Sequence, residues 1–326
     1  MSAPGPMVVS PLPRRVLVVG ATSHVGERLC LRLRRLGVNV DALTRDPGGE
    51  VAQRLAAAGC RLHEGDTLRR WMLWNALAQG AEQVISCTEI VHAEALLQAS
   101  YRTGVERLVC VSSSLRRSRV PSPAALAARH AEVELMESEQ AWTILRPTLV
   151  YGGRRDGACE ALLQWARRHS WLPTVGGGRS LLQPAWVEDL VSAIIETMRR
   201  PRTAGRAYDL GGPAPLPWIE FAQLVWRACG RPLRPVDLPV GVARGLARGL
   251  PTVLGRRGLS PEVVERLLEN RPVDLAPAAR DLDYRPLSYD QALAMKVSGE
   301  AEVERLYAQP ATQPAPAQMP AEDPTP

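Results

Sequence analysis

The sequence predicts an α/β protein with a doubly wound parallel sheet, followed by a smaller, mostly helical C-terminal region. Short apolar runs, typical of strands buried on both faces, alternate with segments of helical periodicity as far as Pro147. Beyond Pro147 the alternation weakens and proline-broken helical segments follow. With 326 residues, 45% of them hydrophobic, the chain is long enough to bury a large core.

Six short segments in the first part of the chain are expected to be strands. They are Val16–Val19, Val38–Leu43, Arg61–Glu64, Val84–Ile85, Leu108–Val111 and Thr143–Leu145. The helices expected between them run from Leu29 to Leu36, through Leu55 and Ala58, from Ala95 to Thr103 and from Ala124 to Ser138. Strands joined by helices of this length form right-handed crossovers, so neighbouring strands run parallel.

The remaining segments are predicted to form mainly helices. In order they are Glu160–His169, Val187–Met198, a last strand at Ala207–Leu210, then Trp218–Cys229, Val240–Leu254 and Pro261–Leu268. We therefore expect a flexible arm over residues 1–13, the α/β domain over 14–210 and a small C-terminal region over 211–307. Residues 308–326 are rich in Pro, Ala and Gln, a composition typical of disorder.

The charge of the chain is basic without being concentrated. The net charge is +6, and Lys296 is the only lysine among 40 basic residues. The arginines are scattered beside Glu and Asp along helical patterns, and aromatic residues make up only 5% of the chain. This distribution is typical of a solvated surface, so a nucleic-acid partner is not expected.

The cysteines and the apolar segments indicate a cytoplasmic protein. The six cysteines are far apart and show neither a CxxC pair nor the spacing of a metal site, so we expect buried free thiols and no metal. No apolar stretch approaches the ~18–20 residues that span a bilayer, and no transmembrane segment is expected. The first 15 residues lack the hydrophobic core of a signal peptide.

A glycine turn between the first strand and the first helix predicts a Rossmann-type dinucleotide site. Gly20 permits a tight turn, and Gly26 lets the helix pack closely on the strand. The helix N-terminus then offers amide N–H groups to a pyrophosphate. The residues predicted to bind the cofactor here are Gly20, Thr22, Ser23, His24, Val25 and Gly26. Ser23 replaces the usual middle glycine and is expected to weaken the approach of the diphosphate; the alternative is a turn that binds no ligand.

Arg45 favours NADP(H) over NAD(H). It closes the second strand, about 20 residues beyond the glycines, where an acidic residue would bind the ribose 2′-hydroxyl of NAD. An arginine suits a 2′-phosphate instead, with Thr44 as a second donor. Asp46 follows immediately, so a simple Arg45–Asp46 ion pair is the alternative.

Polar side chains end the third, fourth and fifth strands. Asp66 is placed to accept a hydrogen bond from the adenine amine, or to act as a helix N-cap. Thr88 and Ser112 follow the next two strands, and Ser113 is a candidate for the nicotinamide pocket or for a local backbone bond. Because the carboxyl ends of parallel strands border the ligand crevice, these residues are predicted to line the site.

Several segments together resemble the extended short-chain dehydrogenase/reductase superfamily. The similarity covers about Arg14 to Ala294; it is carried by Gly20–Gly26, Leu43–Pro47, Gly65–Asp66, Val109–Ser113, Trp142–Gly152, Gln183–Pro184, Val187–Leu190 and Tyr208–Gly212. From Leu259–Pro261 through Asp281–Pro286 the chain is similar to the subgroup of the nucleotide-binding accessory subunit of respiratory complex I. The resemblance implies a nicotinamide dinucleotide and an acid/base tyrosine with a lysine four residues later.

The helix that should carry this pair has neither residue. Between Ser122 and His130 the chain contains no Tyr and no Lys, and Lys296 lies far downstream. Arg129 is a cation that does not release protons, whereas His130 titrates near neutrality. Ser113, Arg129 and His130 are therefore only weak catalytic candidates, and a solvent-facing position is favoured for His130. Arg146 is expected to be structural, bonding loop carbonyls.

Two functions remain open on this basis. The first is a dinucleotide-binding protein without tyrosine–lysine catalysis, acting as a sensor, an assembly factor or a subunit with a protein partner. The second is an active NADP(H)-dependent oxidoreductase or isomerase with other acid/base groups, because hydride chemistry belongs to the cofactor. An interaction module on a vestigial fold is a further alternative.

Overall fold

Seven parallel strands form the central sheet of the protein in a computed structural model, which describes residues 9–66, 70–77, 79–153, 157–249 and 261–299. These strands are β1 (Arg15–Val19), β2 (Asn39–Thr44), β3 (Arg61–Glu64), β4 (Gln83–Ser86), β5 (Arg107–Val111), β6 (Trp142–Pro147) and β11 (Arg206–Leu210). Their order is β11-β6-β5-β4-β1-β2-β3, so the direction of winding reverses between β1 and β4. The predicted doubly wound parallel sheet is confirmed.

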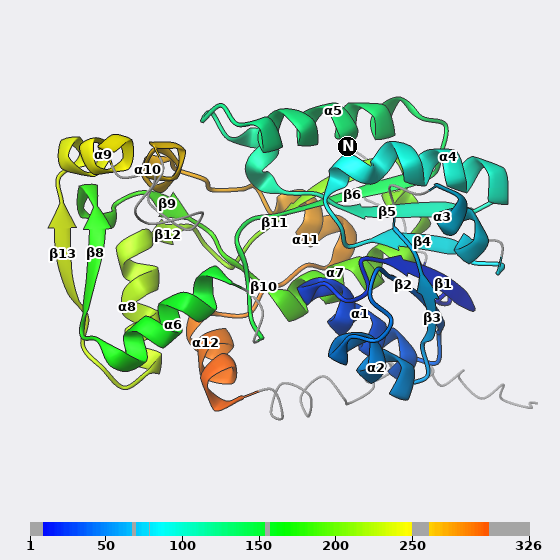
Figure 1. Ribbon diagram of the computed structural model, residues 1–326, viewed down its shortest axis with the longest axis horizontal. Coiled ribbons are helices and arrows are strands. Elements are labelled where there is room, and N and C mark those ends of the chain that lie inside the picture. The colour runs from blue at the N-terminus through cyan, green and yellow to red at the C-terminus, as the bar shows by residue number, and fades with distance from the viewer. Residues whose placement is uncertain (1–8, 67–69, 78, 154–156, 250–260, 300–326) are drawn as a thin grey trace, which may run out of the picture.

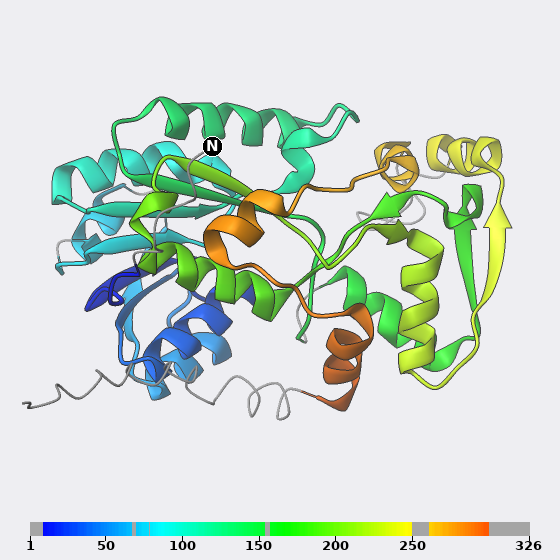
Figure 2. The same cartoon turned by 180° about the vertical axis from the view of Figure 1, so that it is seen from behind.

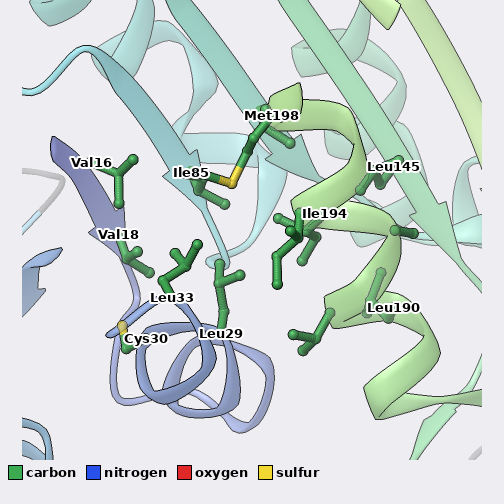
Figure 3. Packing of buried hydrophobic residues seen from close by; sticks show 14 of the residues in the cluster. Val16, Val18, Leu29, Cys30, Leu33, Ile85, Leu145, Leu190, Ile194 and Met198 are labelled. Atoms are coloured by element: carbon green, nitrogen blue, oxygen red, sulfur yellow. The ribbon is translucent and has the colours of Figure 1, made fainter. Parts of the chain in front are cut away.

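Helices cover both faces of this sheet (Figures 1 and 2). One face carries α3 (Arg70–Leu77), α4 (Ala93–Thr103) and α5 (Pro123–Glu137); the other carries α1 (His24–Arg35), α2 (Glu50–Ala57), α7 (Val187–Arg199) and α11 (Ala276–Leu282). In Figure 3 Leu29 and Leu33 of α1 and Ile194 of α7 pack beneath Val18 and Ile85 of the sheet. All five are buried, which is why these strands read as continuous apolar runs.

A smaller lobe lies beside the sheet, on the left in Figure 1. Its helices are α6 (Ala158–Arg168), α8 (Trp218–Ala228), α9 (Val240–Gly249), α10 (Pro261–Leu268) and α12 (Tyr289–Ser298). Its short strands pair two by two: β7 (Val150–Tyr151) with β10 (Ala185–Trp186), β9 (Leu181–Leu182) with β12 (Leu216–Pro217), and β8 (Trp171–Val175) with β13 (Arg234–Leu238). Trp186, Trp226 and Phe221 are buried at its centre.

The predicted boundary at residue 210 does not separate the two lobes. Leu163 and Trp186, which precede it, pack in one cluster with Trp226 of the small lobe. Conversely, Leu282 of α11 packs against the sheet together with α7. The reason is that the chain leaves the sheet after β6 and returns twice, as α7–β11 and as α11. The disorder predicted for residues 308–326 lies outside the described residues, as does the end of the helix expected over Val240–Leu254.

None of the described helices is long and apolar enough to cross a membrane.

Candidate dinucleotide-binding site

The carboxyl ends of β1, β2 and β4 surround a cavity of about 590 Å³. It lies where the strand order reverses, which is the place where open α/β sheets bind their ligands. Six of the ten predicted cofactor-binding residues line it: Gly20, Thr22, Ser23, Arg45, Asp66 and Thr88. The structure thus brings most of the predicted site into one cavity.

The two glycines of the turn are required by close contacts. Gly20 has a φ of 73°, and a Cβ on it would lie 2.6 Å from Cγ2 of Thr88. A Cβ on Gly26 would overlap the carbonyl oxygen of Gly20. Any side chain at Gly26 would therefore push the first turn of α1 away from the loop that borders the cavity.

Ser23 has a local role that the sequence pattern did not predict. Its hydroxyl accepts a hydrogen bond from the Gly26 amide at 3.1 Å, so Ser23 is the N-cap of α1. The cap satisfies one of the amides that would otherwise remain for a diphosphate. His24 points elsewhere: its Cε1 lies 3.0 Å from the position of a Cβ on Gly153. His24, Val25 and Gly26 are not among the residues that line the cavity.

Arg45 and Thr44 differ in their freedom to bind a ligand. Arg45 is exposed at the cavity wall and forms no ion pair with any described residue, including Asp46. Thr44 is buried, and its hydroxyl binds the backbone N–H of Asp46 at 3.2 Å and its carbonyl oxygen at 3.3 Å. Thr44 therefore shapes the turn after β2, and the guanidinium of Arg45 forms no ion pair with a described residue at the cavity wall.

Asp66, which follows β3 beside the end of β2, also lines the cavity and is half-buried. Because residues 67–69 are not described, the alternative role as a helix N-cap stays open. The cavity floor includes Cys87, which the sequence analysis did not single out. Burial raises the pKa of the Cys87 thiol to about 12, so this group is a neutral thiol near pH 7 and a poor nucleophile.

The three catalytic candidates do not line this cavity: Ser113 and Arg129 are hydrogen-bonded to the backbone, and His130 is exposed. Ser113 accepts a hydrogen bond from the Leu115 amide at 3.2 Å. Arg129 donates from Nε to the carbonyl oxygen of Arg116 at 2.7 Å and from Nη2 to that of Ser118 at 2.6 Å. The side chain of His130 is 82% exposed, on the solvent face of α5. None of them faces the others.

A buried carboxylate on α5 was missed by the sequence analysis. Glu132 is fully buried, and its Oε2 accepts hydrogen bonds from Nε of Arg146 at 2.9 Å and Nη2 of Arg146 at 2.6 Å. Arg116 forms an ion pair with the same oxygen, its Nε lying 2.7 Å away. Ser112 donates its hydroxyl to Oε1 of Glu132 at 2.6 Å and is absent from the cavity lining. Arg146 therefore binds a carboxylate, rather than the loop carbonyls expected for it.

Comparisons with known proteins agree with this geometry. A family described as NAD(P)H-binding matches residues 20–162. NADH dehydrogenase (ubiquinone) 1 alpha subcomplex subunit 9, mitochondrial, of Arabidopsis thaliana is 28% identical over 152 residues, which cover 46% of this chain and only 38% of that subunit. NAD(P)H azoreductase of Xenophilus azovorans is 24% identical over 246 residues, or 72% of this chain and 81% of the enzyme.

Solved structures share the fold of nearly the whole chain. UDP-glucose 4-epimerase of Thermotoga maritima superposes with a TM-score of 0.70 and 17% identity, covering 89% of this chain and 99% of the epimerase. dTDP-glucose 4,6-dehydratase of Bacillus anthracis, solved with NAD, gives a TM-score of 0.69 at 13% identity, covering 90% and 98%. With the glycine turn and the strand order, these findings show a Rossmann-type fold, shared with epimerase and dehydratase structures, in which residues 20–162 are similar to NAD(P)H-binding proteins.

Proposed function

We propose that this protein binds NADP(H) and works as a sensor, an assembly factor or a subunit, without the tyrosine–lysine chemistry of its superfamily. The observation that carries the proposal is the content of α5. Over Pro123–Glu137 the helix has no Tyr and no Lys. Arg129 is bound to backbone carbonyls and Glu132 is enclosed by two arginines, so neither is placed to exchange a proton with a substrate.

The only lysine supports the same proposal. Lys296 donates to the carbonyl oxygen of Gly153 at 2.6 Å and to Oε2 of Glu160 at 3.2 Å, on α12 and away from α5. Without a neighbouring cation, a phenol keeps a pKa near ~10 and is a poor base at neutral pH. Tyr151 is an even poorer proton acceptor at neutral pH, because burial raises the pKa of its phenol well above the ordinary value.

The preference for NADP(H) is proposed from Arg45. Its guanidinium is exposed at the cavity and is not neutralised by Asp46. We expect Arg45→Ala to weaken the binding of NADPH about 10- to 100-fold, because this fold-change corresponds to the free energy of one charge-assisted hydrogen bond. The affinity for NADH should change less than twofold.

Isothermal titration calorimetry of both cofactors measures this, with Arg206→Ala as control. Arg206 is also exposed, but it lies at the amino end of β11, the far edge of the sheet from the cavity. Equal losses of NADH and NADPH affinity in Arg45→Ala would contradict a role in binding the 2′-phosphate.

A second candidate function is an NADP(H)-dependent oxidoreductase. The similarity to NAD(P)H azoreductase, which extends over 72% of this chain, favours it. Hydride transfer resides in the cofactor, so a positioned dinucleotide and an open acceptor site suffice in principle.

Turnover separates the two candidates. We expect no oxidation of NADPH above the protein-free rate with azo dyes, quinones or carbonyl compounds. Saturable turnover that Arg45→Ala impairs and Arg206→Ala does not would refute the non-catalytic proposal while supporting the cofactor site.

The proposed protein partner rests on the similarity to the complex I subunit over 46% of this chain. We expect the protein to migrate in a larger assembly when native extract is separated by size-exclusion chromatography. Migration as an isolated chain, with and without NADPH, would contradict a role as a subunit.

A further inference from the structure

A second cavity, of about 420 Å³, lies between the two lobes. Its walls come from α1, α6, β10 and the end of α12, and it shares no lining residue with the dinucleotide cavity. In Figures 1 and 2, α6 and α12 lie side by side in the small lobe. Its volume is within the range of sites that hold small metabolites.

The wall of this cavity is predominantly cationic. Arg28, Arg167 and Lys296 line it, against the single carboxylate of Glu160. Arg28 is paired with Glu188, which lies just outside the lining, so cations still exceed carboxylates by three to two. Arg167 is exposed and has no ion pair or hydrogen bond among the described residues. The imbalance favours an anion.

Two buried side chains of the cavity wall, Lys296 and Trp186, also carry N–H groups. The side chain of Lys296 is 3% exposed, and its ammonium group is held at the wall by the carbonyl oxygen of Gly153 and by Oε2 of Glu160. Trp186 is 1% exposed, and its Nε1 has no hydrogen-bond partner among the described residues. A buried N–H left without an acceptor is unfavourable, and this one belongs to a residue of the cavity wall.

The apolar part of the cavity wall indicates the chemistry of the part of the ligand that carries no charge. The indole of Trp186 and the side chains of Met295 and Val297 line the same cavity. Charged donors beside an apolar surface are complementary to an anionic group carried on a carbon body.

We propose that this cavity binds a small organic anion with a carboxylate or phosphate group, at a site separate from the dinucleotide. The anionic oxygens lie toward Lys296 and Arg167, and the carbon body lies against Trp186 and Met295. The site goes beyond the proposed function, because the binding of NADP(H) uses none of these residues.

The single lysine makes this site observable by NMR. Incorporation of lysine labelled with ¹³C at Cε yields one lysine signal, from Lys296, in the full-length protein. We expect inorganic phosphate or succinate to shift this signal saturably, with potassium chloride at matched ionic strength as reference. Saturation by one anion and not the other identifies the preferred group. A drift equal to that in potassium chloride would overturn the proposal.

Arg167→Gln and Arg168→Gln form a matched pair, since both are exposed arginines on α6 and only Arg167 lines the cavity. We expect Arg167→Gln to weaken the binding of the anion about fivefold and Arg168→Gln to leave its affinity unchanged. Saturating NADPH should also leave it unchanged. A shift that NADPH abolishes and Arg167→Gln does not affect would place the anion in the dinucleotide cavity and overturn the proposal, whether or not NADP(H) binding is confirmed.

Discussion

At the scale of single residues, the nucleotide cavity depends on the absence of one side chain. Gly26 is the position where α1 touches the turn after β1, and a Cβ there would overlap the carbonyl oxygen of Gly20. The cap formed by Ser23 on the Gly26 amide holds the same two segments together. The close contact between Gly26 and Gly20 and the N-cap formed by Ser23 therefore both fix the position of the start of α1.

We expect Gly26→Ala to lower the free energy of unfolding by about 1–3 kcal/mol, as overpacking does, and to weaken NADPH as well. Gly245→Ala is the control. Gly245 lies within α9, no atom lies within 4 Å of a Cβ built on it, and alanine there should stabilise by up to about 1 kcal/mol. Urea denaturation measures both variants; equal behaviour of the two would contradict the packing argument.

At the scale of elements, α5 is held to the strands beside it by a buried carboxylate. Glu132 ties the helix to β6 through Arg146 and to the segment after β5 through Arg116 and Ser112. Burial raises the pKa of neighbouring Asp209, although Arg117, 2.5 Å from the carboxylate, opposes this. The ends of β5, β6 and β11 are thus held together by ion pairs.

Removing the charge of Glu132 leaves two guanidinium groups without their carboxylate. We expect Glu132→Gln to lower the free energy of unfolding by about 3–5 kcal/mol, the range for breaking a buried pair. Glu134→Gln, two residues along the same helix and paired only with exposed His130, should change it by less than about 1 kcal/mol. A similar small effect of both substitutions in urea denaturation would show that the Glu132 cluster adds no stability.

The elements differ in how far the sequence predicts them. The central strands are apolar on both faces and lie between helices, so the pattern of apolar residues is sufficient to predict them. β13 is missed because its sequence, Arg-Pro-Val-Asp-Leu, is mostly exposed and pairs only with β8. Nothing local distinguishes such a segment from a loop.

At the scale of the whole molecule, the two lobes are joined through Asp189. This residue begins α7 against the sheet, and its Oδ2 accepts the backbone N–H of Leu287, just before α12, at 3.0 Å. Burial raises the pKa of the Asp189 carboxyl to about 7; Glu188 acts in the same direction, and the Leu287 bond and Arg32 oppose it. The joint therefore contains a carboxyl group that is protonated in the folded state under mildly acidic conditions.

This shift predicts the pH dependence of stability. An unfolded aspartate loses its proton near pH ~3.9, whereas folded Asp189 keeps it until about 7. Between these values the folded state binds more protons, so the contribution of this group to the free energy of unfolding decreases as the pH rises through the window. We expect the melting temperature of Asp189→Asn to fall less than that of the parent between pH 5 and 7.

Asp290→Asn, at an exposed position, should retain the parental slope. An unchanged slope in Asp189→Asn would show that Asp189 does not hold its proton in the folded state.

The site was predictable where its parts are local in sequence. Gly20, Ser23 and Arg45 each follow a strand, so pattern and strand order place them in one cavity. The Glu132–Arg146 pair and the cavity of Lys296 and Arg28 bring together residues from distant parts of the chain. Their formation depends on packing between elements, which periodicity does not specify.

The buried position of Lys296 also determines how partners of this protein can be sought. Reagents that couple to lysine side chains have a single target here, and it is 3% exposed. Lysine-directed cross-linking or biotinylation would thus find no exposed lysine side chain on the faces of this protein, even inside a stable assembly. Reagents directed at carboxylates or guanidinium groups, which are plentiful on both lobes, are the ones able to map its neighbours.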